Sequence, residues 1–377
     1  MGINNTAALD MSIFRKGFPA TAGSKSLAGF TAPFDATAVT RLAARGASFV
    51  HPEETAEFGI DGLSEDASHD GSACRETRGV LKAVCENRAD YALVNDVFGI
   101  YRREAPKCGC YCIRPTYGTV SRYGLIPTAS SMDQIGVVCK SISAGFGTLS
   151  VIAGCDENDG AMFPDREYGY KPVESPVSVL TPETLLDAAV DGDAEAIRGF
   201  AGNFKRGNIN LEYFNLYKQV MYVLCAAEFS SNVSRYDGIK FGYRAEGYRD
   251  VNDLYVKSRA ESFGPEVKLA VIIGTMALSQ GRYAAHYEKA MKLRRLIRDS
   301  VKLGNDEVIA LPTRIKGGKY ENLALFSLAC LAGLPSVSFS YRGCGMQLIA
   351  GERNENALFS ACKAVESLRR EGNDNEV

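Results

Sequence analysis

The sequence lacks any run of eighteen or more apolar residues, so none of its segments is long enough to cross a bilayer as a helix. It also lacks a strong charge of either sign. Its 43 Lys and Arg residues and 45 Asp and Glu residues leave a net charge of −2, which argues against a general nucleic-acid-binding surface. The eleven cysteines follow no disulfide-scaffold spacing and the N-terminus shows no secretory signal, which favours free thiols in a reducing compartment. We therefore expect a cytoplasmic or organellar-matrix protein without a membrane partner.

What is present is a chain that can bury a large core, since 46% of its 377 residues are hydrophobic. Helical and strand-like segments alternate, which predicts an α/β protein whose central mixed sheet carries helices on both faces. No repeat, linker or low-complexity segment interrupts the pattern, so a single domain over residues 1–377 is expected. The expected helices are Ala36–Gly46 (capped by Asp35), one starting at Thr181, Tyr213–Glu228, Glu266–Arg298 with possible breaks at Gly274 and Gly281, and Glu355–Arg370. The expected buried strands are Ala47–Val50, Leu149–Ala153, Val308–Pro312 and Leu334–Ser340.

The segment Arg114–Gln134 carries the most specific motif, RPTYGTVSRYGLIPTASSMDQ. Further matches lie in order along the chain, from Gly23-Ser24-Lys25 and Glu57-Phe58 to Gly345–Ile349. This ordered set resembles the amidase signature family, in particular the A subunits of tRNA-dependent amidotransferases, which hydrolyse glutamine to ammonia for Glu-tRNA(Gln) or Asp-tRNA(Asn). The resemblance implies a central twisted mixed sheet flanked by helices, here shortened at loops and termini.

The chemistry of that family requires a serine nucleophile, a relay serine and a neutral lysine. The family's nucleophile turn aligns with Val94–Ala105, where matching residues fix the register and place Ile100 at the nucleophile position. The relay serine falls at Glu76 or Thr77, and the lysine falls at Asp10. None of these residues supplies the required group, and loss of a nucleophile alone costs about a million-fold in rate in a serine triad.

The positions that would grip glutamine are also changed. The resemblance places Ala270 where an arginine would bind the substrate carboxylate and Leu323 where an aspartate would bind its amino group. We therefore expect no catalytic residue, no substrate-binding residue, no cofactor and no metal. What would remain is a relic pocket, whose expected residues are Phe98, Gly99, Ser121, Arg235 and Asp237.

The leading hypothesis is a catalytically silent, structural or partner-binding subunit that works with amidotransferase subunits B and C and meets tRNA only through them. An active amidotransferase with relocated catalytic groups is the first alternative, and Lys16, Lys25 and Lys82 would then be its candidate bases. The second alternative is a ligand sensor that uses the relic pocket, which Phe98, Ile100, Ala270 and Leu323 would make apolar.

Two further clusters have an ordinary structural interpretation and a functional one. Cys108, Cys110 and Cys112 favour packing over catalysis or zinc binding, because three sulfurs make an incomplete zinc site and a thiolate needs a base nearby. The second cluster is a basic helix face that favours solvation, with docking of a partner or tRNA as the alternative. Its residues are Lys289, Lys292, Arg294, Arg295 and Arg298.

Overall fold

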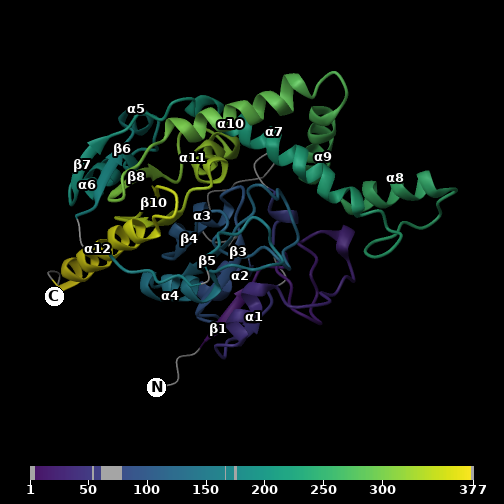
Figure 1. The fold of residues 1–377 in the computed structure, drawn as a ribbon, viewed down its shortest axis with the longest axis horizontal. Helices are drawn as coiled ribbons and strands as arrows, with labels where there is room; N and C mark the ends of the chain where they lie inside the picture. Colours follow the sequence, from purple (N-terminus) through teal and green to yellow (C-terminus); the bar gives the residue numbers. More distant parts are fainter. Residues whose placement is uncertain (1–4, 53–54, 61–78, 166, 174–175, 375–377) are drawn as a thin grey trace.

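The computed structural model describes residues 5–52, 55–60, 79–165, 167–173 and 176–374. Ten strands form one mixed sheet (Figure 1), with parallel pairs toward its two ends and antiparallel pairs in its middle. The predicted α/β class with a mixed sheet is thereby confirmed. In spatial order the strands are β2 (Ser48–Val50), β1 (Thr6–Leu9), β3 (Tyr91–Asn95), β5 (Ile135–Cys139), β4 (Tyr111–Arg114), β9 (Ser336–Tyr341), β10 (Cys344–Ala350), β8 (Glu307–Pro312), β6 (Ser178–Thr181) and β7 (Lys205–Asn208).

Helices cover both faces of the sheet because strand side chains alternate between two apolar layers. In β8, for example, Val308 and Ala310 belong to one core cluster and Ile309 and Leu311 to the other. The first face carries α1 (Thr37–Ala43), α4 (Ile142–Ile152), α6 (Asp193–Ala201) and α12 (Glu355–Asp374). The second carries α2 (Gly79–Cys85), α3 (Ile100–Glu104), α7 (Phe214–Asn232), α9 (Pro265–Leu278), α10 (Lys289–Ser300) and α11 (Lys319–Ala332).

The expected strand at Leu149–Ala153 is wrong, because this segment ends helix α4. Ser141 caps that helix by accepting a hydrogen bond from the backbone N–H of Ala144. Buried side chains then recur every three or four residues, from Ile142 through Phe146 to Ile152. The five-residue apolar run was too short to separate this helical period from a buried strand.

Three expected details at element ends are also corrected. Strand β2 is an edge strand with partly exposed side chains, not a buried one. Asp35 does not cap α1; its carboxylate accepts the backbone N–H of Lys16 at 2.7 Å, and Ala36 occupies the cap position. Thr181 is the last residue of β6, and the helix beyond it, α5 (Glu183–Leu186), is a single short turn.

The long helical segment expected at Glu266–Arg298 divides where the chain turns at Gly281, whose φ is +80°. A π-helical turn over Ala284–Glu288 follows before α10 begins. Gly274 does not break α9. Helices α7 and α9 pack side by side, and α8 (Val251–Ser262) projects from the molecule beyond them (Figure 1). No helix in the described ranges is both long and apolar enough to span a membrane.

Candidate catalytic positions

The positions expected to carry the base and the nucleophile meet at one edge of the sheet. Strands β1 and β3 are parallel neighbours, so their carboxyl ends lie side by side. Asp10 follows β1 directly, and the turn that leads to Ile100 follows β3. The hydroxyl of Tyr101 donates a hydrogen bond to Asp10 Oδ2 at 2.5 Å, across 91 residues of sequence. The aligned register therefore brings the two positions together in space.

Asp10 is a buried carboxylate that accepts hydrogen bonds from several neighbouring groups. Its Oδ1 accepts the backbone N–H and the hydroxyl of Ser12 at 2.9 and 2.7 Å. Its Oδ2 accepts the hydroxyls of Thr55 and Tyr101. Only 5% of Asp10 is exposed. A carboxylate satisfied in this way is a stable structural group, and it offers no amine that could accept a proton from a serine.

Ile100 is the first residue of α3 and is 2% exposed. The preceding Gly99 adopts a left-handed conformation with φ of +75°, and a Cβ at this position would lie 2.3 Å from the Phe326 side chain. The turn therefore requires glycine both for its backbone angle and for space. An aliphatic side chain and a phenyl ring close the point where a nucleophile and its substrate would meet.

The two substrate-binding positions are buried as well. Ala270 on α9 is 2% exposed and Leu323 on α11 is 3% exposed. Both belong to the same apolar cluster as Phe98 and Ile100. Neither side chain can form an ion pair with an amino acid.

The other residues expected in the relic pocket are held by local partners. Ser121 donates its hydroxyl hydrogen bond to Asp156 Oδ2 at 2.6 Å, and Thr37 donates to the same atom. Burial alone would raise the pKa of Asp156, but these hydroxyl donors lower it to about 2. Arg235 donates to the carbonyl of Asn232, and Asp237 accepts the N–H of Ile239. Glu76 and Thr77 lie outside the described residues.

The lysines proposed as relocated bases all lie at the surface. Lys16, Lys25 and Lys82 are exposed, and the ammonium of Lys25 lies 3.9 Å from the centre of the Tyr243 ring.

The cysteine run packs against α2. Cys110 and Cys112 are buried in the cluster that includes Val80 and Val84, and the Cys110 sulfur lies 3.8 Å from the Cys85 sulfur. A contact with Cys108 lowers the pKa of Cys85, but the contact with Cys110 and burial outweigh it and raise that pKa to about 11. No group of three or more metal-ligating side chains is found within the described ranges.

One network near the site was only partly anticipated. Ser24 donates to Glu57 Oε1 at 2.6 Å and shares a 2.7 Å hydrogen bond with the Ser26 hydroxyl. Glu57 Oε2 accepts the N–H of Gly264, and burial raises the pKa of Glu57 despite these donors. The sequence suggested only a local role for Glu57. Nothing in it linked Glu57 to a residue 207 positions away.

The sequence profile of the amidase family matches residues 82–317. The A subunit of the Glu-tRNA(Gln) amidotransferase of Lachnoclostridium phytofermentans is 34% identical over 373 residues, covering 90% of this chain and 75% of the relative. Its counterpart in Nitrosococcus oceani is 35% identical over 382 residues, covering 91% and 79%. The crystal structure of the corresponding protein from Thermotoga maritima superposes with a TM-score of 0.68 at 26% identity, covering 94% of this chain and 81% of that one.

Proposed function

Because this chain belongs to the amidase family, we propose that it is a catalytically silent counterpart of the A subunit of tRNA-dependent amidotransferase, with a structural or partner-binding role. The observation that carries the proposal is that Ile100 is buried and that Asp10, which is hydrogen-bonded to the neighbouring Tyr101, has both carboxylate oxygens occupied by donors. In the register that the sequence motifs predict, these residues stand at the positions of the nucleophile and of its base. Amide hydrolysis in this arrangement would have neither.

The surface supports a partner-binding role. Of the fifteen large hydrophobic side chains exposed in the described part of the chain, twelve lie between Ile239 and Leu296. This segment includes the projecting α8 and the outer side of α9 (Figure 1). Exposed apolar side chains gathered on one segment are typical of a protein interface. Amidotransferase subunits B and C are the partners we propose, with tRNA reached only through them and the complex placed in the cytoplasm or an organellar matrix.

The test measures ammonia release from glutamine by the purified chain, alone and with candidate B and C subunits. An intact A subunit from a relative serves as the positive control. A serine-reactive fluorophosphonate probe, followed by peptide mass spectrometry, searches for an activated hydroxyl without assuming a register. We expect no ammonia above background, no labelled serine, and stable co-purification with the partners.

Ser24 is the first candidate for relocated catalysis, because it is the described serine that donates a hydrogen bond to a half-buried carboxylate with a raised pKa, that of Glu57. Ser24→Ala is therefore the informative variant. Ammonia release by the wild-type chain that Ser24→Ala abolishes, or labelling of Ser24, would overturn the silent-subunit proposal and establish an active amidotransferase or amidase. If the chain released no ammonia and also failed to bind subunits B and C, the proposed partner-binding role would be wrong.

A further inference from the structure

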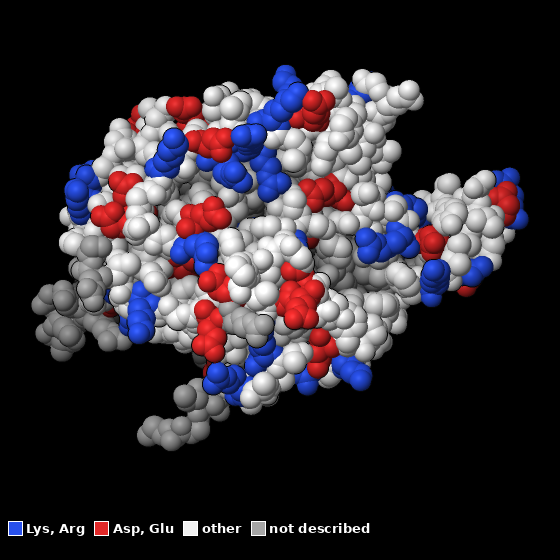
Figure 2. All heavy atoms as spheres, viewed as in Figure 1, with Lys and Arg blue, Asp and Glu red and all other residues white. Residues whose placement is uncertain are grey.

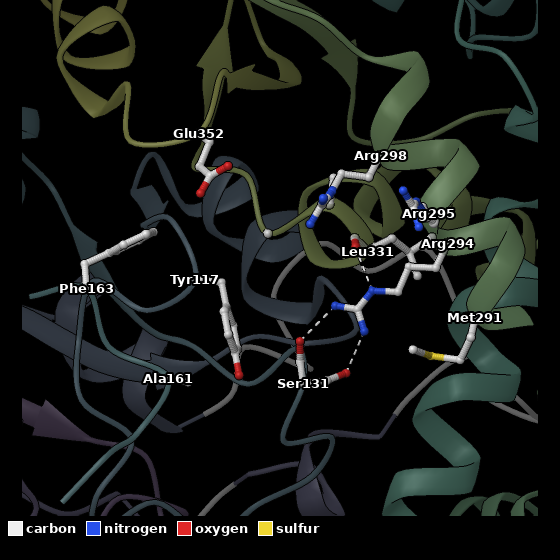
Figure 3. A pocket seen from close by; sticks show the side chains of 12 residues that line it. Tyr117, Ser131, Ala161, Phe163, Met291, Arg294, Arg295, Arg298, Leu331 and Glu352 are labelled. Atoms are coloured by element: carbon white, nitrogen blue, oxygen red, sulfur yellow. Dashed lines mark hydrogen bonds between the residues drawn. The ribbon is translucent and has the colours of Figure 1, made fainter. Parts of the chain in front are cut away.

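A hollow lies away from the catalytic positions, between α10, the end of α11 and the loops that face them (Figure 3). Its volume of about 590 Å³ falls within the range of small-molecule sites. Leu323 at the old substrate position and Leu331 in this hollow are both on α11, eight residues apart, which corresponds to about 12 Å along the helix. The hollow is therefore distinct from the relic pocket.

Arg294 forms a rigid floor for this hollow. Its Nε donates to the carbonyl of Leu331 at 2.8 Å, and its two terminal nitrogens donate to the hydroxyl and carbonyl of Ser131 at 2.7 and 2.9 Å (Figure 3). Ser131 in turn donates its N–H and hydroxyl to Glu228 on α7. Arg294 thus joins α10 to the end of α11 and to the loop containing Ser131, and Ser131 continues the network to α7, so this side of the hollow is held by contacts within the protein.

Arg295 and Arg298 add positive charge to the hollow that nearby carboxylates neutralise only in part. Both interact with a single carboxylate, that of Asp299, at 3.5 and 3.7 Å, and their side chains are 82% and 64% exposed. The adjoining cavity adds Lys302, and Glu352 lines both cavities. Basic side chains gather over α10 in Figure 2. Cations near the C-terminal end of α10 are favoured by the helix dipole. The dipole does not explain why these cations also line a cavity.

Aromatic side chains form the opposite wall. The Tyr117 hydroxyl accepts from Arg122 at 2.7 Å and donates to the carbonyl of Ser130, which fixes its ring. The guanidinium of Arg353 lies 4.7 Å from the centre of the Phe163 ring. In Figure 3 both rings stand across the hollow from the arginines of α10. Fixed aromatic rings offer a surface on which a planar base can stack.

We propose that this hollow binds a nucleoside monophosphate. The phosphate contacts Arg295 and Arg298, whose planar guanidiniums match phosphate oxygens in two-point contacts. The base lies against Tyr117 and Phe163, and the carboxylate of Glu352 accepts a hydrogen bond from a ribose hydroxyl. The arrangement separates a cationic end from an aromatic end, which a phosphate or a nucleoside alone would fill only in part.

The first test is calorimetric titration of the full chain with AMP, with adenosine and inorganic phosphate measured at the same ionic strength. We expect AMP to bind at least about tenfold more tightly than either fragment. A six-residue single-stranded RNA separates the two possible sources of a nucleotide, a free molecule and an RNA. Absence of AMP binding, equal binding of adenosine, or binding of the RNA but not of AMP would overturn the proposal.

Matched variants on one helix locate the site. Arg298→Gln removes a charge that lines the hollow, whereas Lys289→Gln removes a charge from the same helix outside it. Both side chains are exposed, so both variants are expected to fold. We expect Arg298→Gln to weaken AMP binding about tenfold or more and Lys289→Gln to leave it unchanged. Phe163→Leu should weaken AMP binding without changing that of phosphate. Equal losses in the two charge variants would indicate a diffuse electrostatic effect and contradict the site.

Discussion

At the scale of single residues, buried polar contacts hold the turn that leads to Ile100. Arg102, two positions after Ile100, is completely buried and donates to Asp96 at 2.9 Å. It also donates to the carbonyl of Phe326 and to Gln347. An unpaired charge here would cost several kcal/mol, about 3–5 in comparable cases. These contacts fix the turn at which the sequence motifs predict the nucleophile position.

His51 provides a test at this scale. Burial and the nearby Arg15 lower its pKa from 6.5 to about 4, its ring stacks on Phe18 at 4.3 Å, and its Nε2 is buried without a hydrogen-bond partner. The unfolded chain therefore binds a proton first as the pH falls, and stability should decrease between pH 6.5 and 4. For a fully buried group this shift is worth about 3 kcal/mol; partial exposure reduces it to roughly 1–2 kcal/mol.

The control for His51 is His51→Phe, which keeps an aromatic ring against Phe18 and removes the titration. Urea denaturation midpoints measured from pH 7 to pH 4 should fall less steeply for the variant than for the wild type. Titrating carboxylates act on both proteins equally and cancel in the comparison. Identical pH dependence of the two proteins would show that His51 does not titrate with a lowered pKa.

At the scale of elements, hydrophobic periodicity predicted the long helices and the core strands, and it failed for segments too short to show a repeating pattern. The helices at Phe214–Asn232 and Glu355–Asp374 and the strands β8 and β9 were found near their expected bounds. These segments show several turns of one period, or an apolar run buried on both faces. The segment Leu149–Ala153 showed neither, and β2 was predicted as buried because its place at the sheet edge is not encoded locally.

Gly274 illustrates the same limit and gives an element-scale prediction. The sequence suggested a helix break, but a Cβ at this position would lie 1.9 Å from the carbonyl oxygen of Ala226, where α9 crosses α7. Gly274→Ala should therefore push the helices apart and destabilise the chain by about 1–3 kcal/mol. Chemical denaturation measures the loss.

Gly147, within α4, is the matched control, because a Cβ there would meet no atom within 4 Å. Gly147→Ala should stabilise the chain by about 0.5–1 kcal/mol through helix propensity alone. If both alanine variants changed stability in the same direction, the close α7–α9 approach would not be what selects glycine.

At the scale of the whole molecule, ordered motifs were enough to predict the family and the class of fold. They also gave the register that assigns Asp10 to the family's lysine position and Ile100 to its nucleophile position. They could not predict how those positions are filled. The contacts of Asp10 with Thr55 and Tyr101 span 45 and 91 residues, and the Phe326 ring comes from another helix altogether. Such contacts depend on how the sheet brings distant segments together, which no local pattern records.

The exposed face of α9 gives the prediction at this scale. Ile272 is 66% exposed and Met276, one turn later, is 38% exposed. If this segment binds the partner subunits, Ile272→Glu places a charge within an apolar interface and should reduce co-purification with subunits B and C at least about tenfold. The variant's denaturation midpoint should stay within about 0.5 kcal/mol of wild type, since surface changes rarely alter stability more.

Tyr213→Asn is the control outside the Ile239–Leu296 segment. It removes an aromatic side chain of 38% exposure, and asparagine tolerates the positive φ of 63° at this position. Its co-purification with B and C should equal that of the wild type. Full binding by Ile272→Glu would move the interface away from α9, because a glutamate carboxylate would not remain desolvated and unpaired in a stable complex. An equal loss in both variants would mean that general surface hydrophobicity, and not this helix, holds the subunits together.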